Sequence, residues 1–478
     1  MHITVFGLVA YLAALVPAHA QSLTVGRTSG RPGQSVSLAG SGFGKSEAID
    51  VFVDTTDTEL VVSNSAGNLN SSVSIPASVQ PGTHYLTAIG RRSGDAAQVA
   101  YNVTTAWAQE GFGVAHLSWN PYENTISSAN VATLGLLWSR HISTNGSTPA
   151  VVNGKVFVTS LSGLLALSSA TGAVLWNKLP DAQFAGSPTV AGNFVYAITS
   201  FNAPVLYALN ATTGATVWTQ TLAQSDASPI VVNGIIYVAC NNGTMYALKA
   251  ATGALLWSST LGGTVTQSSD AAVVDGTVYV GSGSAIYALD AATGAQIWSF
   301  ATGSTIERSP SVANGIVYVG SDDGNVYALR AGTGATLWTY TTGSAVYQSP
   351  AVAAGIVYIG SQDDHLYALD AHTGALHWAF TASNVLGNAI VANKVVYATA
   401  RDGSLHALDA TTGVLLANAH FGYTVVGNPV VSDGVLYLNT FSNGVYAFGL
   451  LAGVNAQKAH VSAPSIMSLH PDRRLKVR

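Results

Sequence analysis

One phrase of 22 residues recurs along the chain. Residues 317–338 read VYVGSDDGNVYALRAGTGATLW, and residues 357–378 read VYIGSQDDHLYALDAHTGALHW. Weaker copies carry the same turn glycine, which falls at Gly172, Gly214, Gly253, Gly294, Gly334, Gly374 and Gly413. Successive glycines are 42, 39, 41, 40, 40 and 39 residues apart. A fixed period of about 40 residues predicts an array of equivalent supersecondary units rather than one irregular core.

Each repeat contains four short segments with the composition of β-strands. In the fifth copy these segments are SPSVA, IVYVGS, NVYALRA and ATLW. Asn-Gly or Asp-Gly pairs separate the first two segments in several copies and suit the positive φ angles of a two-residue hairpin turn. Four antiparallel strands in about 40 residues form the unit of a β-propeller blade. The predicted fold class is therefore all-β.

The number of strand sets predicts the number of blades. Sets of three inner strands begin near Pro149, Pro188, Pro229, Ala271, Pro310, Pro350, Ala389 and Pro429. Fourth strands end at Trp176, Trp218, Trp257, Trp298, Trp338, Trp378 and Ala417, so the last set lacks one. An unmatched fourth strand, GLLW, stands ahead of the first set at residues 135–138. We expect an eight-bladed propeller over residues 130–451, closed by this N-terminal strand because an unclosed ring would expose two sheet edges.

The repeated tryptophan predicts how neighbouring blades are held together. A buried tryptophan hides about 150–250 Å² of surface. At about 25 cal/mol per Å² this burial contributes up to about 5 kcal/mol. One tryptophan in each blade is therefore expected to fix that blade to the next.

The parts of the chain outside the repeats differ in composition. Residues 1–20 have an apolar stretch followed by Ala-His-Ala, which predicts a signal peptide cleaved before Gln21. Residues 21–104 alternate short apolar runs with turns and predict a small β-sandwich. Residues 105–129 are rich in aromatic side chains, so we expect this junction to pack on the ring. Residues 452–478 are expected to form a C-terminal extension.

Composition excludes several classes of protein. Only 9% of residues are charged and the net charge is -5, which does not favour a nucleic-acid partner. The single cysteine, Cys240, allows neither a disulfide framework nor a C-x-x-C-H haem attachment site, and no cysteine follows the signal peptide to carry a lipid anchor. No run after the signal peptide approaches the roughly 20 apolar residues that a membrane helix needs. We therefore expect a secreted or periplasmic protein, monomeric, without a membrane span.

The Y-A-L-x-A-x-T-G-x-x-L-W signature of residues 327–338 resembles the PQQ-like (pyrroloquinoline quinone-like) β-propeller repeat over residues 130–450. This resemblance implies either a quinoprotein dehydrogenase or a non-catalytic propeller of the kind that assists outer-membrane barrel assembly. The stretches RPGQSVSLAGSGF and VQPGTHYLTAIG resemble an Ig-like domain of the IPT/TIG type. The vicinal cysteine pair of quinoprotein alcohol dehydrogenases is missing, and the repeats of 39 to 42 residues lack the long insertions that build their pocket.

Propeller geometry predicts where a binding site would lie. The loop that precedes each innermost strand, here called the leading loop, shares one face of the ring with the second hairpin, which joins the second and third strands. Large polar side chains gather on this face in blades five and six. The candidate cofactor-binding residues are Glu307, Arg308, Tyr347 and Gln348. The candidate metal ligands are Asp322, Asp323, Asp363 and Asp364, since Ca²⁺ takes six to eight oxygen ligands.

Two kinds of function remain open from these residues. The first is an exported, non-catalytic binding or scaffolding protein that presents its loop face to a cell-envelope protein or a glycan. The second is a PQQ-dependent quinoprotein oxidoreductase of alcohols or sugars, with PQQ and Ca²⁺ near the channel mouth. A polysaccharide adhesin is a further alternative, with Tyr347, Phe201 and Phe441 as the exposed aromatic side chains it would need. No catalytic residue is assigned.

Overall fold

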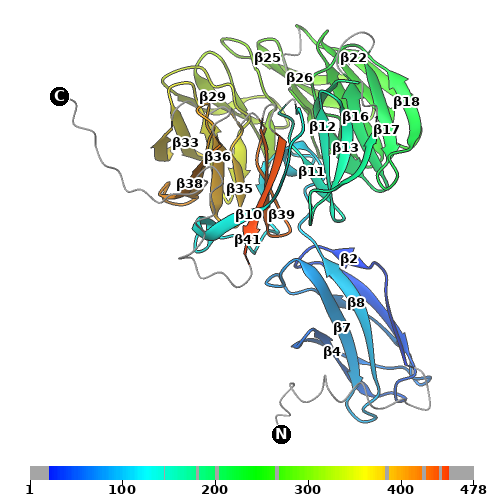
Figure 1. The fold of residues 1–478 in the computed structure, drawn as a ribbon. Coiled ribbons are helices and arrows are strands. Elements are labelled where there is room, and N and C mark those ends of the chain that lie inside the picture. Colours follow the sequence, from blue (N-terminus) through cyan, green and yellow to red (C-terminus); the bar gives the residue numbers. More distant parts are fainter. Residues whose placement is uncertain are drawn as a thin grey trace, which may run out of the picture. The chain divides into compact units, whose positions relative to one another are not determined.

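The structure is a computed structural model of the 478-residue chain. The chain forms two compact units, residues 1–105 and residues 106–478. The structure describes residues 21–144, 146–178, 182–199, 204–263, 269–382, 387–421, 427–440 and 444–451 (Figure 1). The predicted signal peptide and C-terminal extension lie outside these residues. Apart from two short 3₁₀ turns, η2 (Glu110–Phe112) and η3 (Val131–Thr133), the described elements are all strands. The predicted all-β class is confirmed.

The first unit contains two sheets around one apolar core. One sheet has the order β1 (Ser22–Val25), β3 (Ser35–Ser41) and β6 (Leu69–Ser74). The other has the order β2 (Ser29–Gly30), β8 (Ala96–Val103), β7 (Gly82–Gly90), β4 (Ala48–Val53) and β5 (Thr56–Val62). Alternate residues of both sheets enter a shared core that includes Leu38, Val51 and Leu86. This is a β-sandwich. Its assignment to the Ig-like class stays a prediction.

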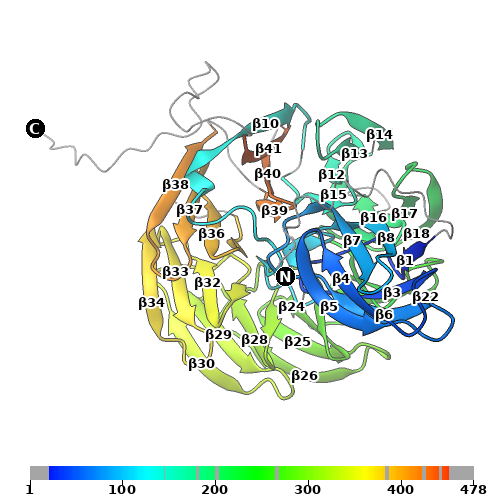
Figure 2. The same ribbon diagram turned by 90° about the horizontal axis from the view of Figure 1, so that it is seen from below.

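The second unit consists of eight sheets that follow one another around a ring (Figure 2). The first sheet contains β11 (Ala150–Val152), β12 (Lys155–Ser160), β13 (Gly163–Ser168) and β14 (Val174–Lys178), and the second contains β15 (Phe184–Ala191), β16 (Phe194–Thr199), β17 (Val205–Asn210) and β18 (Thr216–Thr221). The third contains β19 (Ile230–Val232), β20 (Ile235–Cys240), β21 (Thr244–Lys249) and β22 (Leu255–Thr260), and the fourth contains β23 (Ala272–Val274), β24 (Thr277–Ser282), β25 (Ala285–Asp290) and β26 (Gln296–Ala301).

The next three sheets continue this order. They are β27 (Ser311–Ala313), β28 (Ile316–Gly320), β29 (Asn325–Arg330) and β30 (Thr336–Thr341); β31 (Ala351–Ala353), β32 (Ile356–Gly360), β33 (His365–Asp370) and β34 (Leu376–Thr381); and β35 (Ile390–Ala392), β36 (Val395–Thr399), β37 (Ser404–Asp409) and β38 (Leu415–His420), with β9 (Trp119–Asn120) added beside β35. The eighth combines β39 (Val430–Ser432), β40 (Val435–Thr440) and β41 (Gly444–Leu450) with β10 (Leu134–Arg140). The N-terminal strand β10 is thus the fourth strand of the last sheet.

Tight hairpins join the strands as the sequence predicted. In the turn between β27 and β28, Asn314 and Gly315 have φ angles of 50° and 75°. Both angles lie in the left-handed region that a two-residue turn of this kind requires. The same pairing recurs at Asn153 and Gly154, which have φ angles of 51° and 72°.

Each tryptophan of the repeat joins its blade to the next. Its indole Nε1 donates a hydrogen bond of 2.7 to 3.3 Å to a backbone carbonyl oxygen of the following blade. For Trp298 the acceptor is the carbonyl of Ala331, which also accepts a hydrogen bond from the Tyr279 hydroxyl. The tryptophans concerned are Trp138, Trp176, Trp218, Trp257, Trp298, Trp338 and Trp378. The predicted role of this position is confirmed.

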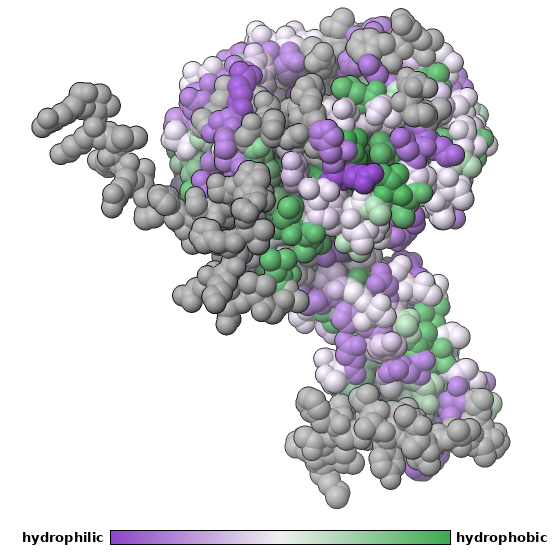
Figure 3. Space-filling model, viewed as in Figure 1, coloured by the Kyte–Doolittle hydropathy of each residue, from purple (hydrophilic) through white to green (hydrophobic). Residues whose placement is uncertain are grey.

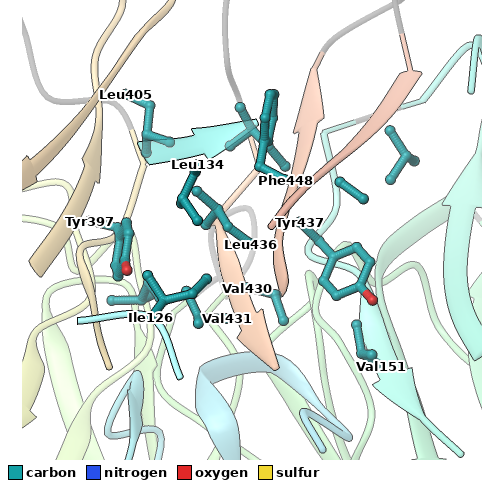
Figure 4. Packing of buried hydrophobic residues seen from close by; sticks show 14 of the residues in the cluster. Ile126, Leu134, Val151, Tyr397, Leu405, Val430, Val431, Leu436, Tyr437 and Phe448 are labelled. Atoms are coloured by element: carbon teal, nitrogen blue, oxygen red, sulfur yellow. The ribbon is translucent and has the colours of Figure 1, made fainter. Parts of the chain in front are cut away.

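The junction between the seventh and eighth blades is built differently. Ala417 occupies the tryptophan position of the seventh blade. The segment that precedes β10 contributes Ile126 and Val131 to the core there, and both side chains are fully buried. Figure 4 shows Ile126 among Tyr397, Val431 and neighbouring side chains of the two blades. The chain therefore replaces the missing tryptophan with residues that come before the first blade in sequence.

Candidate functional site

Residues 107–120, here called the belt, pass the innermost strands of all eight blades in sequence order. The belt begins at the first blade, where Trp107 and Val151 exchange two backbone hydrogen bonds. At the second blade the backbone N–H of Val190 donates to the Ala108 carbonyl oxygen at 2.8 Å. At the third the N–H of Val231 donates to Gln109 Oε1 at 3.4 Å.

The belt then continues to the remaining blades. The backbone N–H groups of four equivalent valines donate to belt carbonyl oxygens at 2.6 to 2.9 Å. These pairs are Val273 with Val114, Val312 with Ala115, Val352 with Leu117 and Val391 with Ser118. At the eighth blade the Asn120 side chain donates to the Val431 carbonyl oxygen at 2.8 Å. The junction that the sequence singled out for its aromatic residues therefore runs around the centre of the ring.

Three residues before each of these valines lies a second circle of contacts, here called the polar ring. In six pairs of described residues a backbone N–H donates to the side-chain oxygen of the equivalent residue in the next blade, at 2.5 to 2.9 Å. The polar ring consists of Thr148, Ser187, Ser228, Asp270, Ser309, Ser349, Asn388 and Asn428. Seven of these side chains are neutral, so Asp270 is the one acid in the polar ring.

Glu110 of the belt reaches into the polar ring. Its carboxylate accepts hydrogen bonds from the Ser187 hydroxyl at 2.6 Å and from the Asn428 amide at 2.5 Å. These residues belong to the second and eighth blades, so one carboxylate connects two blades that flank the first. Glu110 is buried, and its two oxygens are matched with donors as a buried carboxylate requires.

Asp270 of the fourth blade lies beside His116 of the belt. Asp270 Oδ1 accepts the backbone N–H of Ser228, while Oδ2 lies 3.9 Å from His116 Nε2. Both side chains are only 2% exposed. Burial and the negative charge of Glu110 raise the pKa of Asp270 well above its usual range. Burial also lowers the pKa of His116 to about 4, because a charged imidazole is poorly solvated there.

The belt backbone is shaped to bring His116 to this place. Gly111 has a φ of 65°, and a Cβ atom there would lie 2.6 Å from the Nδ1 atom of His116. His116 itself has a φ of 54°, in the left-handed region that side chains other than glycine rarely adopt. The His116 ring therefore depends on a glycine beside it.

The residue before each polar-ring position lies one step closer to the loop face. Six of these eight residues are glycine, alanine or serine, namely Ser147, Gly186, Ala227, Ser269, Gly387 and Gly427. The other two are Arg308 and Gln348, which the sequence had selected as candidate cofactor-binding residues. Arg308 is half-buried and its charge acts favourably on Asp270, while Gln348 is buried. Both residues therefore lie directly before the polar ring, on the side of the leading loops. Their role in binding a cofactor stays a prediction.

Glu307 and Tyr347, the other two candidate cofactor-binding residues, are half-buried and precede Arg308 and Gln348. The leading loops and second hairpins do share a face, since the N–H of Asp322 donates to the Thr305 carbonyl oxygen at 2.9 Å. Burial and the nearby charge of Glu307 raise the pKa of Asp322 to about 6. Glu307 therefore lies beside a second carboxyl group, which does not favour the binding of a negatively charged cofactor at that residue.

Two of the four carboxylates chosen as metal ligands have local partners. Asp323 accepts hydrogen bonds from the Gly303 N–H and the Tyr327 hydroxyl, and Asp363 repeats this pattern with Gly343 and Tyr367. These contacts lower the pKa of both carboxyl groups and stabilise the hairpins. Asp364 is exposed and takes the positive φ of its turn. Within the described residues, no group of three or more His, Cys, Asp or Glu side chains could hold a metal ion.

Glu110, His116 and Asp270 were missed from the sequence. Glu110 and His116 belong to the junction, whose path around the ring has no signature in the repeat. Asp270 did leave a signal, because it stands where the other repeats have Ser, Thr or Asn before a proline or alanine. An acid at a position that otherwise carries neutral side chains marks a departure from purely structural repetition.

Comparison with solved structures supports the propeller fold. BamB from Moraxella catarrhalis is 22% identical with a TM-score of 0.58, covering 66% of this chain and 99% of that one. Quinohemoprotein alcohol dehydrogenase from Comamonas testosteroni is 18% identical with a TM-score of 0.63, covering 72% of this chain and 80% of the other. The computationally designed Ika8 protein is 17% identical with a TM-score of 0.55, covering 65% of this chain and 100% of that one. At these identities the likeness concerns the fold alone.

Comparison with protein-family models identifies the family of the chain. No curated protein matches the chain. The sequence model described as outer membrane protein assembly factor BamB matches residues 122–285, 241–352 and 282–469. Within the described residues, no helix is both long and apolar enough to span a membrane. Because the matched segments together extend from residue 122 to residue 469, more than half of the chain, the protein belongs to the family described as outer membrane protein assembly factor BamB.

Proposed function

We propose that this protein is an exported, non-catalytic binding or scaffolding protein whose loop face contacts a protein partner of the cell envelope. The family description, an assembly factor for outer-membrane proteins, supports a protein partner over a glycan. The predicted signal peptide supports export. We assign the partner to the leading loops and second hairpins, where side chains differ between the repeats.

The belt is the observation that carries this proposal. Its hydrogen bonds use the inner edge of every blade, from Val151 in the first to Val431 in the eighth. The centre of the ring is therefore fixed by the chain itself. The variable residues Glu307, Tyr347 and Asp364 remain half-exposed or exposed on the loop face. A rigid ring with a varied rim of loops suits recognition of another macromolecule.

The outer strands offer a second kind of surface. Figure 3 shows apolar residues in small patches on the visible face, between polar ones. Exposed apolar side chains recur on the fourth strands, including Leu255, Ile297, Leu337 and Leu376. On β22 two of them, Leu255 and Leu256, are adjacent, and polar residues follow in the same strand. Apolar atoms contribute much of any protein surface, so these side chains do not by themselves indicate an interface. The loop face, with its clustered charges, is therefore the preferred contact surface.

A quinoprotein oxidoreductase is the alternative that the fold suggests. PQQ is a tricarboxylate, so its site needs several cationic or neutral donor groups. At this centre Arg308 is the one cationic side chain found among the described residues, whereas Glu110 and Asp270 are acidic. These residues do not fit the cofactor. No catalytic step through it is derived.

Photo-cross-linking tests the proposed contact surface. A cross-linking residue replaces Tyr347 on the loop face or, as a matched control, Thr333 in an exposed turn between β29 and β30 on the opposite face. We expect a discrete cross-linked partner in the cell envelope from position 347 and none from position 333. Cross-links from position 333 alone, or from neither position, would contradict the assignment.

Calorimetric titration with PQQ, with and without Ca²⁺, tests the alternative. We expect no saturable binding, and no dye reduction with a panel of alcohols and sugars. Calcium-dependent binding that is lost in Arg308→Ala, together with turnover of any substrate, would overturn the non-catalytic proposal.

A further inference from the structure

The centre of the ring contains polar groups that the scaffold does not use. Four side chains, here called the polar centre, gather there: Glu110 and His116 from the belt, and Asp270 and Arg308 from the blades. Glu110 serves the ring, since both its oxygens accept hydrogen bonds from neighbouring blades. The other three present groups whose presence the packing of the blades does not explain.

His116 Nε2 is one of these groups. It is buried and has no hydrogen-bond partner among the described residues. The nearest charged atom is Asp270 Oδ2 at 3.9 Å, which is too long for a hydrogen bond. An unmatched polar atom in a protein interior costs free energy. We therefore expect His116 Nε2 to have a hydrogen-bond partner in another state of the protein.

Asp270 is the second group. The polar ring needs only an acceptor oxygen at this position, and Asp270 Oδ1 provides it for the Ser228 N–H. Asparagine does the same work at the equivalent positions 388 and 428. An ionisable carboxyl group is therefore not required for closure of the ring. Its second oxygen, Oδ2, faces His116 Nε2.

Arg308 is the third group. No hydrogen bond or ion pair joins its guanidinium to another of the described residues. It lies one residue before the polar ring, at a level where most blades carry glycine, alanine or serine. Its charge acts on Asp270, so the two groups lie in one electrostatic environment. A half-buried guanidinium with five unused donors is well suited to a carboxylate.

We propose that the polar centre binds a free α-amino acid. Asp270 Oδ2 and His116 Nε2 accept hydrogen bonds from the ligand's ammonium group, and Arg308 donates to its carboxylate. A zwitterion satisfies the acidic and the basic side of the centre together. A simple anion would face Glu110 and Asp270, and a simple cation would face Arg308.

The direction of approach follows from the belt. The belt bonds to the innermost strands three residues beyond the polar ring, on the side away from the leading loops. Arg308 lies on the loop side of the polar ring. The ligand therefore enters from the loop face, with its carboxylate outermost.

Ionisation of Asp270 gives an independent readout. Burial and the charge of Glu110 raise its pKa, so a bound ammonium group would favour the charged form and release a proton. Calorimetry in two buffers of different ionisation enthalpy measures this release. The amino acid should release protons on binding to the native protein and release fewer in Asp270→Asn.

The test uses the twenty amino acids in thermal-shift and calorimetric titrations of the mature chain. Two derivatives serve as matched controls for the best ligand: its N-acetyl form keeps only the carboxylate, and its amide keeps only the ammonium. We expect each derivative to bind about tenfold or more weakly than the free amino acid, because each loses one set of charge-assisted hydrogen bonds. If both derivatives bind as tightly as the free amino acid, the proposal is overturned.

Variants locate the site. Asp270→Asn keeps the acceptor that Ser228 needs, so it should fold, and Arg308→Gln removes the guanidinium at the half-buried loop level. Each should weaken binding about tenfold or more, while Arg330→Gln, which removes an exposed guanidinium at the end of β29, leaves it unchanged. The proposal fails if none of the twenty amino acids shifts the melting temperature or gives binding heat. It also fails if binding survives both substitutions.

Discussion

The contact between Trp298 and Gly334 gives the sharpest test of how the blades are joined. Gly334 has a φ of 70°, and a Cβ atom there would lie 2.6 Å from Cε3 of Trp298. Gly315 has nearly the same backbone, with a φ of 75°, but a Cβ atom there would meet no other atom within 4 Å. The two positions therefore separate backbone strain from steric overlap within one blade.

The expected costs differ accordingly. Gly315→Ala should lower the free energy of unfolding by about 1–2 kcal/mol, because it only places an L-residue in the left-handed region. Gly334→Ala should have the same backbone cost. Its methyl group must also displace the Trp298 indole, and this overpacking adds about 1–3 kcal/mol. The total for Gly334→Ala is then about 2–5 kcal/mol. Urea unfolding followed by far-UV circular dichroism measures both values.

A double-mutant cycle identifies the cause. Trp298→Ala alone should cost about 3–5 kcal/mol, since it removes a buried indole and its hydrogen bond to the Ala331 carbonyl oxygen. In that background the overlap is gone, so Gly334→Ala should cost no more than Gly315→Ala. If Gly334→Ala costs the same with and without the indole, or if the two glycine variants cost the same in the native background, the argument for docking through this contact is refuted.

Three further predictions test other parts of the structure. Because the pKa of His116 is lowered to about 4 from an ordinary 6.5, the unfolded chain binds a proton between these pH values that the folded protein does not. As the pH falls from 6.5 to 4, the free energy of unfolding should therefore decrease by up to about 3 kcal/mol more than in His116→Gln. Equal pH slopes of the two proteins in urea titrations would contradict this. A chain beginning at residue 106 should melt cooperatively, whereas one beginning at residue 142 lacks the belt and β10, exposes the edge of β41, and should aggregate on size-exclusion chromatography. Asp363→Asn should lower the free energy of unfolding by about 1–3 kcal/mol, because the Asp363 carboxylate accepts hydrogen bonds from the Gly343 N–H and the Tyr367 hydroxyl. Millimolar Ca²⁺ should leave the melting temperature of the native protein and of the variant unchanged. A calcium-dependent rise in melting temperature that the substitution abolishes would support the predicted metal site instead.

The repeat made much of the fold predictable because its chemistry is local. An Asn-Gly pair specifies its own turn, as the φ angles of Asn314 and Gly315 show. A tryptophan at a fixed place in each repeat meets the same carbonyl of the next blade, so one contact predicts the others. The count of strands likewise placed β10 beside β41, since one fourth strand was missing and one was in excess.

The polar centre could be predicted only in part. Arg308 stood out because aligned leading loops differ there, and position in the repeat fixes its level in the ring. Glu110 and His116 could not be placed, since the belt has no repeat to align and its path depends on contacts with eight strands at once. Aspartates in the second hairpins were chosen as ligands because turn formation and metal binding favour the same residue type. Partners such as Tyr327 and Tyr367 reveal the structural role of Asp323 and Asp363.

The use of N-terminal residues to close the ring also sets the order in which the chain can fold. Glu110 and its partner Asn428 are separated by 318 residues, and β10 must wait for β41, the last described strand. Each blade can form its hairpins as soon as it is made, but the belt and β10 stay without their final partners until the eighth blade exists. Contacts this distant in sequence fold slowly, because loop closure must precede them. Until the eighth blade is made, the chain therefore carries an unpaired strand and an unfinished centre, and it depends on fast local folding of the blades to avoid aggregation.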